Sequence, residues 1–210
     1  MSRSKSSQRW LQEHFKDPYA QQAKQEGFRS RAVYKLQAIQ AQDKILQPGM
    51  LVIDLGAAPG GWAQYAATQI AGGSRFGQVI ALDILPMNPI PDVQFIQGDF
   101  REQTVLEQLL ATLNQRPVDL VISDMAPNIS GISAVDQPRA MYLAELALEL
   151  AKQVLKPSGN FLLKVFEGEG LEAYRTELKA TFAQVVSRKP DASRARSREY
   201  YILAKNYRLR

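Results

Sequence analysis

Short apolar runs recur along the chain and alternate with longer segments in which apolar residues have helical spacing. A short apolar run between polar stretches predicts a buried strand, and a spacing of three to four residues predicts an amphipathic helix. Strands are expected over residues 50–54, 78–83, 93–99, 119–124, 160–166, 184–188 and 199–204. Helices are expected over residues 62–70, around the leucines at 106, 109, 110 and 113, and over 139–155 and 171–182. The alternation predicts an α/β fold, with helices on both faces of a doubly wound, mostly parallel, seven-stranded sheet.

The first part of the chain differs from this pattern. Residues 1–27 are polar and basic, and they predict a partly flexible N-terminal segment that ends in a helix. From Val33 the helical spacing resumes, with Ser30 as a candidate cap ahead of that helix. Residues 156–159, Lys-Pro-Ser-Gly, predict a turn before the fifth strand. The chain has no internal repeat or linker, so residues 28–210 are expected to form a single domain.

Composition narrows the class of protein. No apolar run approaches the roughly 20 residues of a membrane-spanning helix, and the first residues lack the apolar core of a secretory signal. The chain has no cysteine and one histidine, which excludes disulfides and makes a metal site implausible. We therefore expect a cytoplasmic protein that binds neither a metal nor a membrane.

Charge is distributed unevenly. Residues 1–35 hold eight Lys and Arg against three Asp and Glu, residues 36–155 hold six against twelve, and residues 156–210 hold twelve against six. Basic surface commonly supplies phosphate contacts to nucleic acid, and acidic clefts commonly bind hydroxyls and cations. A solvated surface of mixed sign explains the same counts equally well.

The segment from Val52 to Trp62 predicts a strand, a glycine-rich loop and the start of a helix. Small residues let backbone N–H groups approach a ligand, and the helix N-terminus adds partial positive charge, so this loop suits a nucleotide-like cofactor. The dinucleotide fingerprint G-x-G-x-x-G is absent, and Pro59 removes a backbone donor where a pyrophosphate needs one. A cofactor without phosphates and with a cationic centre fits better, and S-adenosylmethionine is the obvious candidate.

Four of the predicted strands end in an acid: Asp54, Asp83, Asp99 and Asp124. One such acid is commonplace, because Asp terminates strands well, but four in succession at the ligand-binding edge of a parallel sheet indicate a site. Asp83 lies where an acid receives ribose hydroxyls in related folds. Asp99 is a candidate acceptor for an adenine amine, and Asp124 would lie nearest the sulfonium and its methyl group.

Two further features are unusual. Lys164 lies inside the apolar fifth strand, where it should contact a carboxylate or reach into a cleft, and Asp124 on the fourth strand is its expected neighbour. The loop that begins at Arg188 carries five basic residues and leads directly to Glu199, so it is a plausible phosphate track. The simpler interpretation of Lys164 is a side chain that extends along the sheet into solvent. The simpler interpretation of Lys35 is an ordinary exposed lysine on a helix.

Together these segments resemble the FtsJ/RrmJ (RlmE) family of S-adenosylmethionine-dependent ribosomal RNA 2'-O-ribose methyltransferases. The resemblance covers most of the chain and rests on residues 30–36, 54–62, 123–128, 136–143, 164–170 and 188–199. It implies a Rossmann-like methyltransferase fold and a K-D-K-E tetrad at Lys35, Asp124, Lys164 and Glu199. It also implies cofactor contacts at Gly60, Trp62, Asp83, Asp99 and Asp124. The loop over residues 72–78 is slightly longer than the family pattern.

The resemblance also implies the substrate, which is the ribose of a uridine in large-subunit ribosomal RNA within the assembled subunit. We expect the protein to be a monomer. Lys164 is the candidate general base for the hydroxyl, although a purely positioning role stays open. A methyltransferase acting on tRNA or an mRNA cap would use the same tetrad. A noncatalytic RNA-binding protein on this fold fits the basic ends, and a nicotinamide-dependent dehydrogenase shares the fold class but is disfavoured by the missing fingerprint.

Overall fold

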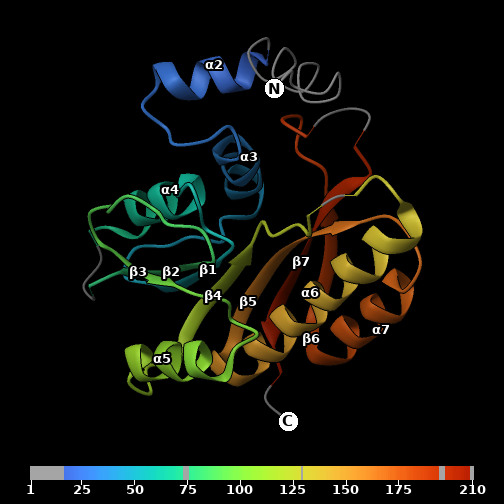
Figure 1. Ribbon diagram of the computed structural model, residues 1–210. Coiled ribbons are helices and arrows are strands. Elements are labelled where there is room, and N and C mark those ends of the chain that lie inside the picture. Colours follow the sequence, from blue (N-terminus) through green and yellow to red (C-terminus); the bar gives the residue numbers. More distant parts are fainter. Residues whose placement is uncertain (1–16, 73–75, 129, 194–196, 209–210) are drawn as a thin grey trace.

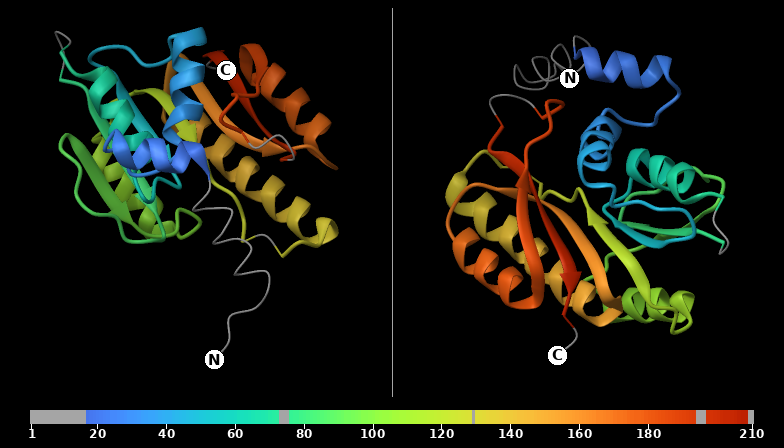
Figure 2. Two further views of the ribbon diagram at one scale, coloured as in Figure 1. Left: turned by 90° about the horizontal axis from the view of Figure 1, so that it is seen from above. Right: turned by 180° about the vertical axis from the view of Figure 1, so that it is seen from behind.

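The computed structural model describes residues 17–72, 76–128, 130–193 and 197–208, which include a seven-stranded sheet with helices on both faces (Figures 1 and 2). The strands are β1 (Leu51–Leu55), β2 (Gln78–Asp83), β3 (Val93–Gln97), β4 (Val118–Ser123), β5 (Leu155–Phe166), β6 (Phe182–Arg188) and β7 (Glu199–Tyr207). Their order is β3-β2-β1-β4-β5-β7-β6. All pairings from β3 to β5 are parallel, and β7 is antiparallel to both its neighbours. The predicted α/β architecture is confirmed.

The helices form two layers around this sheet. They are α2 (Pro18–Gln25), α3 (Val33–Asp43), α4 (Gly61–Ile70), α5 (Gln103–Leu113), α6 (Ser133–Val154) and α7 (Leu171–Thr181). Buried side chains of α3 and α4 pack on one face, and those of α5, α6 and α7 pack on the other. Figure 1 shows α2 beyond α3, away from the sheet. None of the helices in the described part of the chain has the length and apolar content that crossing a lipid bilayer requires.

The central strands lie where the apolar runs predicted them. Every residue of β1 and of β4 is buried. Parallel strands covered by helices on both sides are buried on both faces, and this is why they read as continuous apolar runs rather than as alternating patterns. The sheet therefore holds the carboxyl ends of β1, β2, β3 and β4 at one edge of a well-packed core.

Two predicted boundaries were wrong by five residues or more. Helix α6 begins at Ser133, six residues before the predicted start at 139, although Pro138 lies inside it. The carboxylate of Asp136 accepts hydrogen bonds from the backbone N–H groups of Ser130 and Gly131, which stabilises the first turn. Strand β5 begins at Leu155 rather than 160, because the predicted turn is an irregularity within the strand: Ser158 has a φ of 65° and the pairing with β4 shifts register there.

Two side chains were also assigned wrongly. Ser30 does not cap α3 with its side chain. Its hydroxyl lies against Gly61, and its backbone carbonyl accepts a hydrogen bond from the N–H of Val33. Leu110 was expected on the apolar stripe of α5 but is 39% exposed, because Leu109 already occupies the buried position beside it.

Candidate active site

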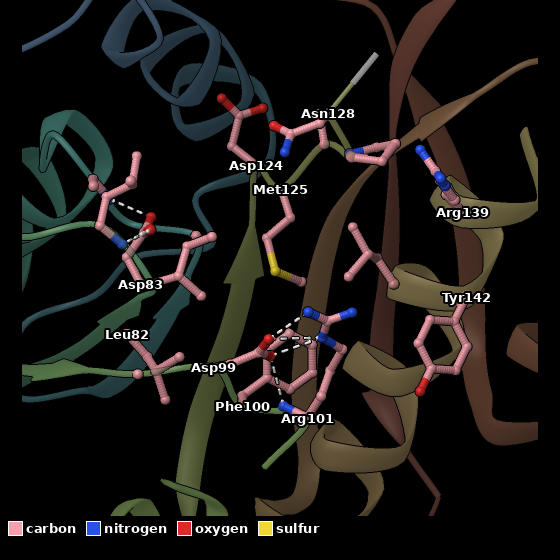
Figure 3. A pocket seen from close by; sticks show the side chains of 18 residues that line it. Leu82, Asp83, Asp99, Phe100, Arg101, Asp124, Met125, Asn128, Arg139 and Tyr142 are labelled. Atoms are coloured by element: carbon pink, nitrogen blue, oxygen red, sulfur yellow. Dashed lines mark hydrogen bonds and ion pairs between the residues drawn. The ribbon is translucent and has the colours of Figure 1, made fainter. Parts of the chain in front are cut away.

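The loops after β1, β2, β3 and β4 surround a cavity of about 600 Å³ at the carboxyl edge of the sheet (Figure 3). In this strand order the connections reverse direction between β1 and β4, which is the point where doubly wound sheets bind ligands. The lining includes Gly56, Ala58, Asp83, Asp99, Phe100, Arg101, Asp124, Met125, Asn128, Arg139 and Tyr142. Three of the four predicted strand-end acids therefore face one cavity.

The wall formed by the loop after β1 is made of small residues. Gly56 has a φ of 74°, and a Cβ at this position would overlap the side chain of Met125. Asp83 accepts hydrogen bonds from the backbone N–H groups of Ala58 and Leu85, both at 2.8 Å. Asp83 thus fixes the loop after β1 and the loop after β2 against each other while still lining the cavity.

Asp99 is ion-paired within its own loop. Arg101 donates from Nε to both carboxylate oxygens, at 2.9 and 2.8 Å, and from Nη2 to one of them at 2.5 Å. This guanidinium holds the pKa of the Asp99 carboxyl below its usual value. A ligand that donates to Asp99 must therefore share the carboxylate with Arg101 or displace it.

Asp54 lies beneath the cavity rather than in its wall. Its side chain is buried, with the residue 1% exposed, and neither oxygen has a hydrogen-bond partner of ordinary geometry in the described part of the chain. Burial raises the pKa of Asp54 well above its usual value, and the charges of Asp124 and Asp83 add to that effect, while the N–H of Ala63 opposes it. Burial therefore favours the protonated form of the Asp54 carboxyl.

Asp124 and Lys164 form the first pair of the predicted tetrad. Lys164 Nζ lies 3.2 Å from Asp124 Oδ1 and donates to the backbone carbonyl of Asp124 at 2.6 Å. The expectation that these residues are neighbours on β4 and β5 is confirmed. The Lys164 side chain is only 8% exposed, so its ammonium group is directed by these two contacts rather than by solvent.

Lys35 and Glu199 form the second pair. Lys35 lies in the first turn of α3, and Glu199 is the first residue of β7, yet Lys35 Nζ donates to Glu199 Oε1 at 2.6 Å. Their side chains are 11% and 14% exposed. The simpler interpretation of Lys35 as an exposed helical lysine is wrong.

Tyr201 joins the two pairs, and sequence reasoning missed it. Its hydroxyl donates to Asp124 Oδ1 at 2.6 Å, and Lys35 Nζ lies 5.8 Å from the centre of its ring. Tyr201 is the direct partner of Lys164 in the antiparallel register of β5 and β7. Burial, followed by the charge of Asp124, raises the pKa of Tyr201 well above its usual value, so the hydroxyl stays a donor. Its place in Glu199-Tyr200-Tyr201, two residues after a tetrad member, was the available signal.

Gly60 and Trp62 lie outside the cavity lining. Gly60 has a φ of 105°, and a Cβ there would overlap the side chains of Ile90 and Met87, so the loop after β2 packs directly on it. The side chain of Trp62 is buried and faces α3 and β7. The predicted cofactor contacts at these two positions therefore involve backbone atoms if they form, and they stay predictions.

Part of the predicted phosphate track, residues 188–199, forms contacts within the protein. Arg188 forms two hydrogen bonds with the Asp43 carboxylate, at 2.7 and 2.9 Å, and Lys205 donates to the same group. Burial alone would raise the pKa of Asp43, but these contacts hold it below its usual value. Residues 194–196, with two of the five basic side chains, lie outside the described residues, as do residues 1–16 of the predicted N-terminal segment.

Comparison with known proteins gives a consistent result. The profile of the FtsJ-like methyltransferase family matches residues 28–207. A Cellvibrio japonicus protein named ribosomal RNA large subunit methyltransferase E is 58% identical over 99% of this chain and 97% of its own length. A Pseudomonas aeruginosa protein of the same name is 59% identical over 99% of each chain. A crystal structure from Plasmodium falciparum, assigned as a ribosomal RNA methyltransferase, superposes with a TM-score of 0.77 at 27% identity, covering 86% of this chain and 98% of that one.

Proposed function

This chain belongs to the FtsJ-like methyltransferase family, and we propose that it transfers a methyl group from S-adenosylmethionine to a ribose 2'-hydroxyl of large-subunit ribosomal RNA. The target nucleoside is a uridine, and the substrate is the assembled ribosomal subunit. The observation that carries this proposal is the pair of ion pairs, Lys35–Glu199 and Lys164–Asp124, beside an acid-lined cavity. The names of the relatives support ribosomal RNA as the acceptor.

The cavity fits S-adenosylmethionine. Its volume is about 600 Å³, within the range of roughly 300–1,000 Å³ that is common for small-molecule sites. Asp83 suits ribose hydroxyls, Asp99 suits the adenine amine, and Asp124 suits the neighbourhood of the sulfonium. The small residues Gly56 and Ala58 leave room along one wall. When bound there, the cofactor supplies an electrophilic methyl group.

The protein contributes alignment, charge and a proton acceptor. Methyl transfer is an in-line displacement, so most of the acceleration comes from fixing the hydroxyl opposite the methyl group. Lys35 and Glu199 orient the target ribose or its phosphate. Lys164 is the general base that accepts the hydroxyl proton, and Asp124 fixes its Nζ within the site. An ammonium group has no lone pair, so the neutral amine of Lys164 is the form that accepts the proton, and its two N–H groups can still donate to the two oxygens of Asp124.

The remaining features of the proposal concern the whole molecule. Residues 28–210 act as one methyltransferase domain, and residues 1–27 form a basic N-terminal segment. The protein works as a monomer in the cytoplasm. The excess of Lys and Arg in residues 1–35 and 156–210 supports electrostatic attraction to RNA on these parts of the chain.

The direct test is methyl transfer from radiolabelled S-adenosylmethionine to large ribosomal subunits from cells that lack this protein. Nuclease digestion then identifies the labelled nucleoside. We expect label in 2'-O-methyluridine. Label on the base rather than the ribose, or no transfer to subunits alongside transfer to tRNA, would reject the proposed substrate. Cofactor binding without transfer to any RNA would favour the noncatalytic alternative.

The role of Lys164 is tested by two substitutions. Lys164→Ala removes both the base and the charge, and Lys164→Arg keeps a charged donor that cannot be deprotonated in a protein. We expect turnover at saturating cofactor to fall by at least about 100-fold in both variants, in line with general-base catalysis, while cofactor affinity changes little. Substantial turnover by Lys164→Arg would show that Lys164 positions the hydroxyl and does not take its proton.

A further inference from the structure

Trp62 connects the cofactor loop to the tetrad from within the core. It is the second residue of α4, directly after the glycine loop, and it is 3% exposed. Its indole Nε1 donates to the backbone carbonyl of Ala32 at 2.8 Å. Its ring lies 5.6 Å from the ring of Tyr201, centre to centre. The indole is therefore turned away from the cofactor cavity and towards the elements that carry Lys35 and Tyr201.

The carbonyl that Trp62 contacts is the one that begins the helix of Lys35. The backbone N–H of Lys35 donates to the same oxygen of Ala32 at 3.1 Å, in the first turn of α3. The cap of this helix has no side-chain hydrogen bond, because the N-cap residue is Ala32. The indole N–H thus shares a carbonyl with the first turn of α3, whose backbone N–H groups donate to the carbonyls three residues earlier at 3.1–3.3 Å.

The second contact of Trp62, with the ring of Tyr201, also bears on Lys35. Lys35 Nζ lies over the ring of Tyr201, and the same ring packs with Trp62 in one buried cluster. A shift of the indole would move both the backbone and the aromatic ring that place Lys35 Nζ. The Lys35 side chain has a flexible four-carbon stem, so the direction of its Nζ depends on the backbone and the Tyr201 ring around it.

We propose that Trp62 is a positioning residue for the reaction: its indole holds Lys35 in line with Glu199 through Ala32 and Tyr201, and does not contact the cofactor. The proposal rests on the proposed function, because it assigns Lys35 a part in orienting the ribose. The indole of Trp62 then serves to align the RNA substrate and not to bind the cofactor. It also makes α4 a direct link between the cofactor loop and the RNA-orienting pair.

The primary test is Trp62→Phe, which keeps an aromatic ring and removes the N–H. We expect kcat to fall about tenfold, with the dissociation constant for S-adenosylmethionine, measured by calorimetry, unchanged within twofold. Tyr65→Phe is the matched control, since it removes one polar atom from a half-buried ring one turn further along α4. It should leave both quantities unchanged. A weakened cofactor affinity with normal kcat in Trp62→Phe would overturn the proposal.

A double-mutant cycle separates positioning from general damage to the fold. In a Lys35→Ala background, Trp62→Phe should cost less than threefold in kcat, because the group that it positions is already absent. A full tenfold loss in that background would refute action through Lys35. Where the cavity left by Phe prevents folding, benzothienylalanine at position 62 keeps the ring shape without the N–H, and the same values are expected.

A measurement independent of turnover distinguishes failure of this proposal from failure of the proposed function. Hydrogen exchange of the backbone amides at residues 33–36 should be faster in Trp62→Phe than in the wild type and in Tyr65→Phe. Unchanged exchange would reject the positioning role even if the protein methylates ribosomal RNA. Faster exchange in a protein whose wild type transfers no methyl group would support the contact and reject the reaction.

Discussion

Replacing the buried acid under the cofactor loop should change how stability depends on pH. Burial, then the charges of Asp124 and Asp83, raises the folded-state pKa of Asp54 well above its usual value. In the unfolded chain the same carboxyl has a pKa of about 3.9. Between these two values the folded protein keeps a proton that the unfolded chain has released. The contribution of Asp54 to stability is therefore fully present below pH 3.9 and is lost as pH rises through the folded pKa.

The size of the effect follows from proton linkage. One proton retained by the folded state lowers the free energy of unfolding by about 1.4 kcal/mol for each pH unit within this window. Asp54→Asn has a side chain of nearly the same shape that does not titrate. The free energy of unfolding of the variant minus that of the wild type should therefore rise by about 1.4 kcal/mol per pH unit from pH 5 upwards, until pH reaches the folded pKa of Asp54.

Urea unfolding at constant ionic strength, at pH 5, 6 and 7, measures this difference. Asp99→Asn is the control with the opposite sign. The hydrogen bond from Arg101 lowers the pKa of Asp99, so its contribution is present above pH 3.9 and is lost only as pH falls through the folded pKa. Its difference from the wild type should be constant from pH 5 to 7. A constant difference for Asp54→Asn as well would show that Asp54 is ionised in the folded protein.

Two further substitutions probe the acids that line the cavity. Tyr201→Phe removes the hydroxyl that donates to Asp124 Oδ1. The loss of a hydrogen bond to a charged group predicts a fall in kcat of roughly tenfold. A normal kcat would mean that Lys164 alone orients Asp124. Arg101→Gln removes the guanidinium that is paired with the carboxylate of Asp99. Because a bound cofactor must share or break this charge-assisted pair, the substitution should tighten S-adenosylmethionine binding by roughly threefold. Weaker binding, measured by calorimetry, would show instead that Arg101 holds Asp99 in its binding orientation.

The architecture was predictable because its signals are local. Buried parallel strands produce continuous apolar runs, and β2 was located to the residue. The errors occurred where a local signal was outweighed by contacts from elsewhere. The apolar segment predicted a start at 139 for α6, but Asp136 stabilises an earlier one. The turn residues before Asn160 lie inside a strand that pairs with β4. Propensity sets such boundaries only where no neighbouring element competes for the backbone.

The site was predictable only as far as strand ends determine it. Acids at the carboxyl ends of parallel strands share an edge whatever the details of packing, so three of the four could be placed in one cavity from sequence. The link between the two ion pairs could not be predicted from sequence. It depends on β7 pairing antiparallel with β5, which places Tyr201 opposite Lys164. A one-residue shift in that register would turn Glu199 and Tyr201 to the other face of the sheet. The pairing of β5 with β7 therefore brings Tyr201 and Glu199 to Lys164, which the pairing of β4 with β5 already places beside Asp124. Lys35 of α3 joins them through its ion pair with Glu199.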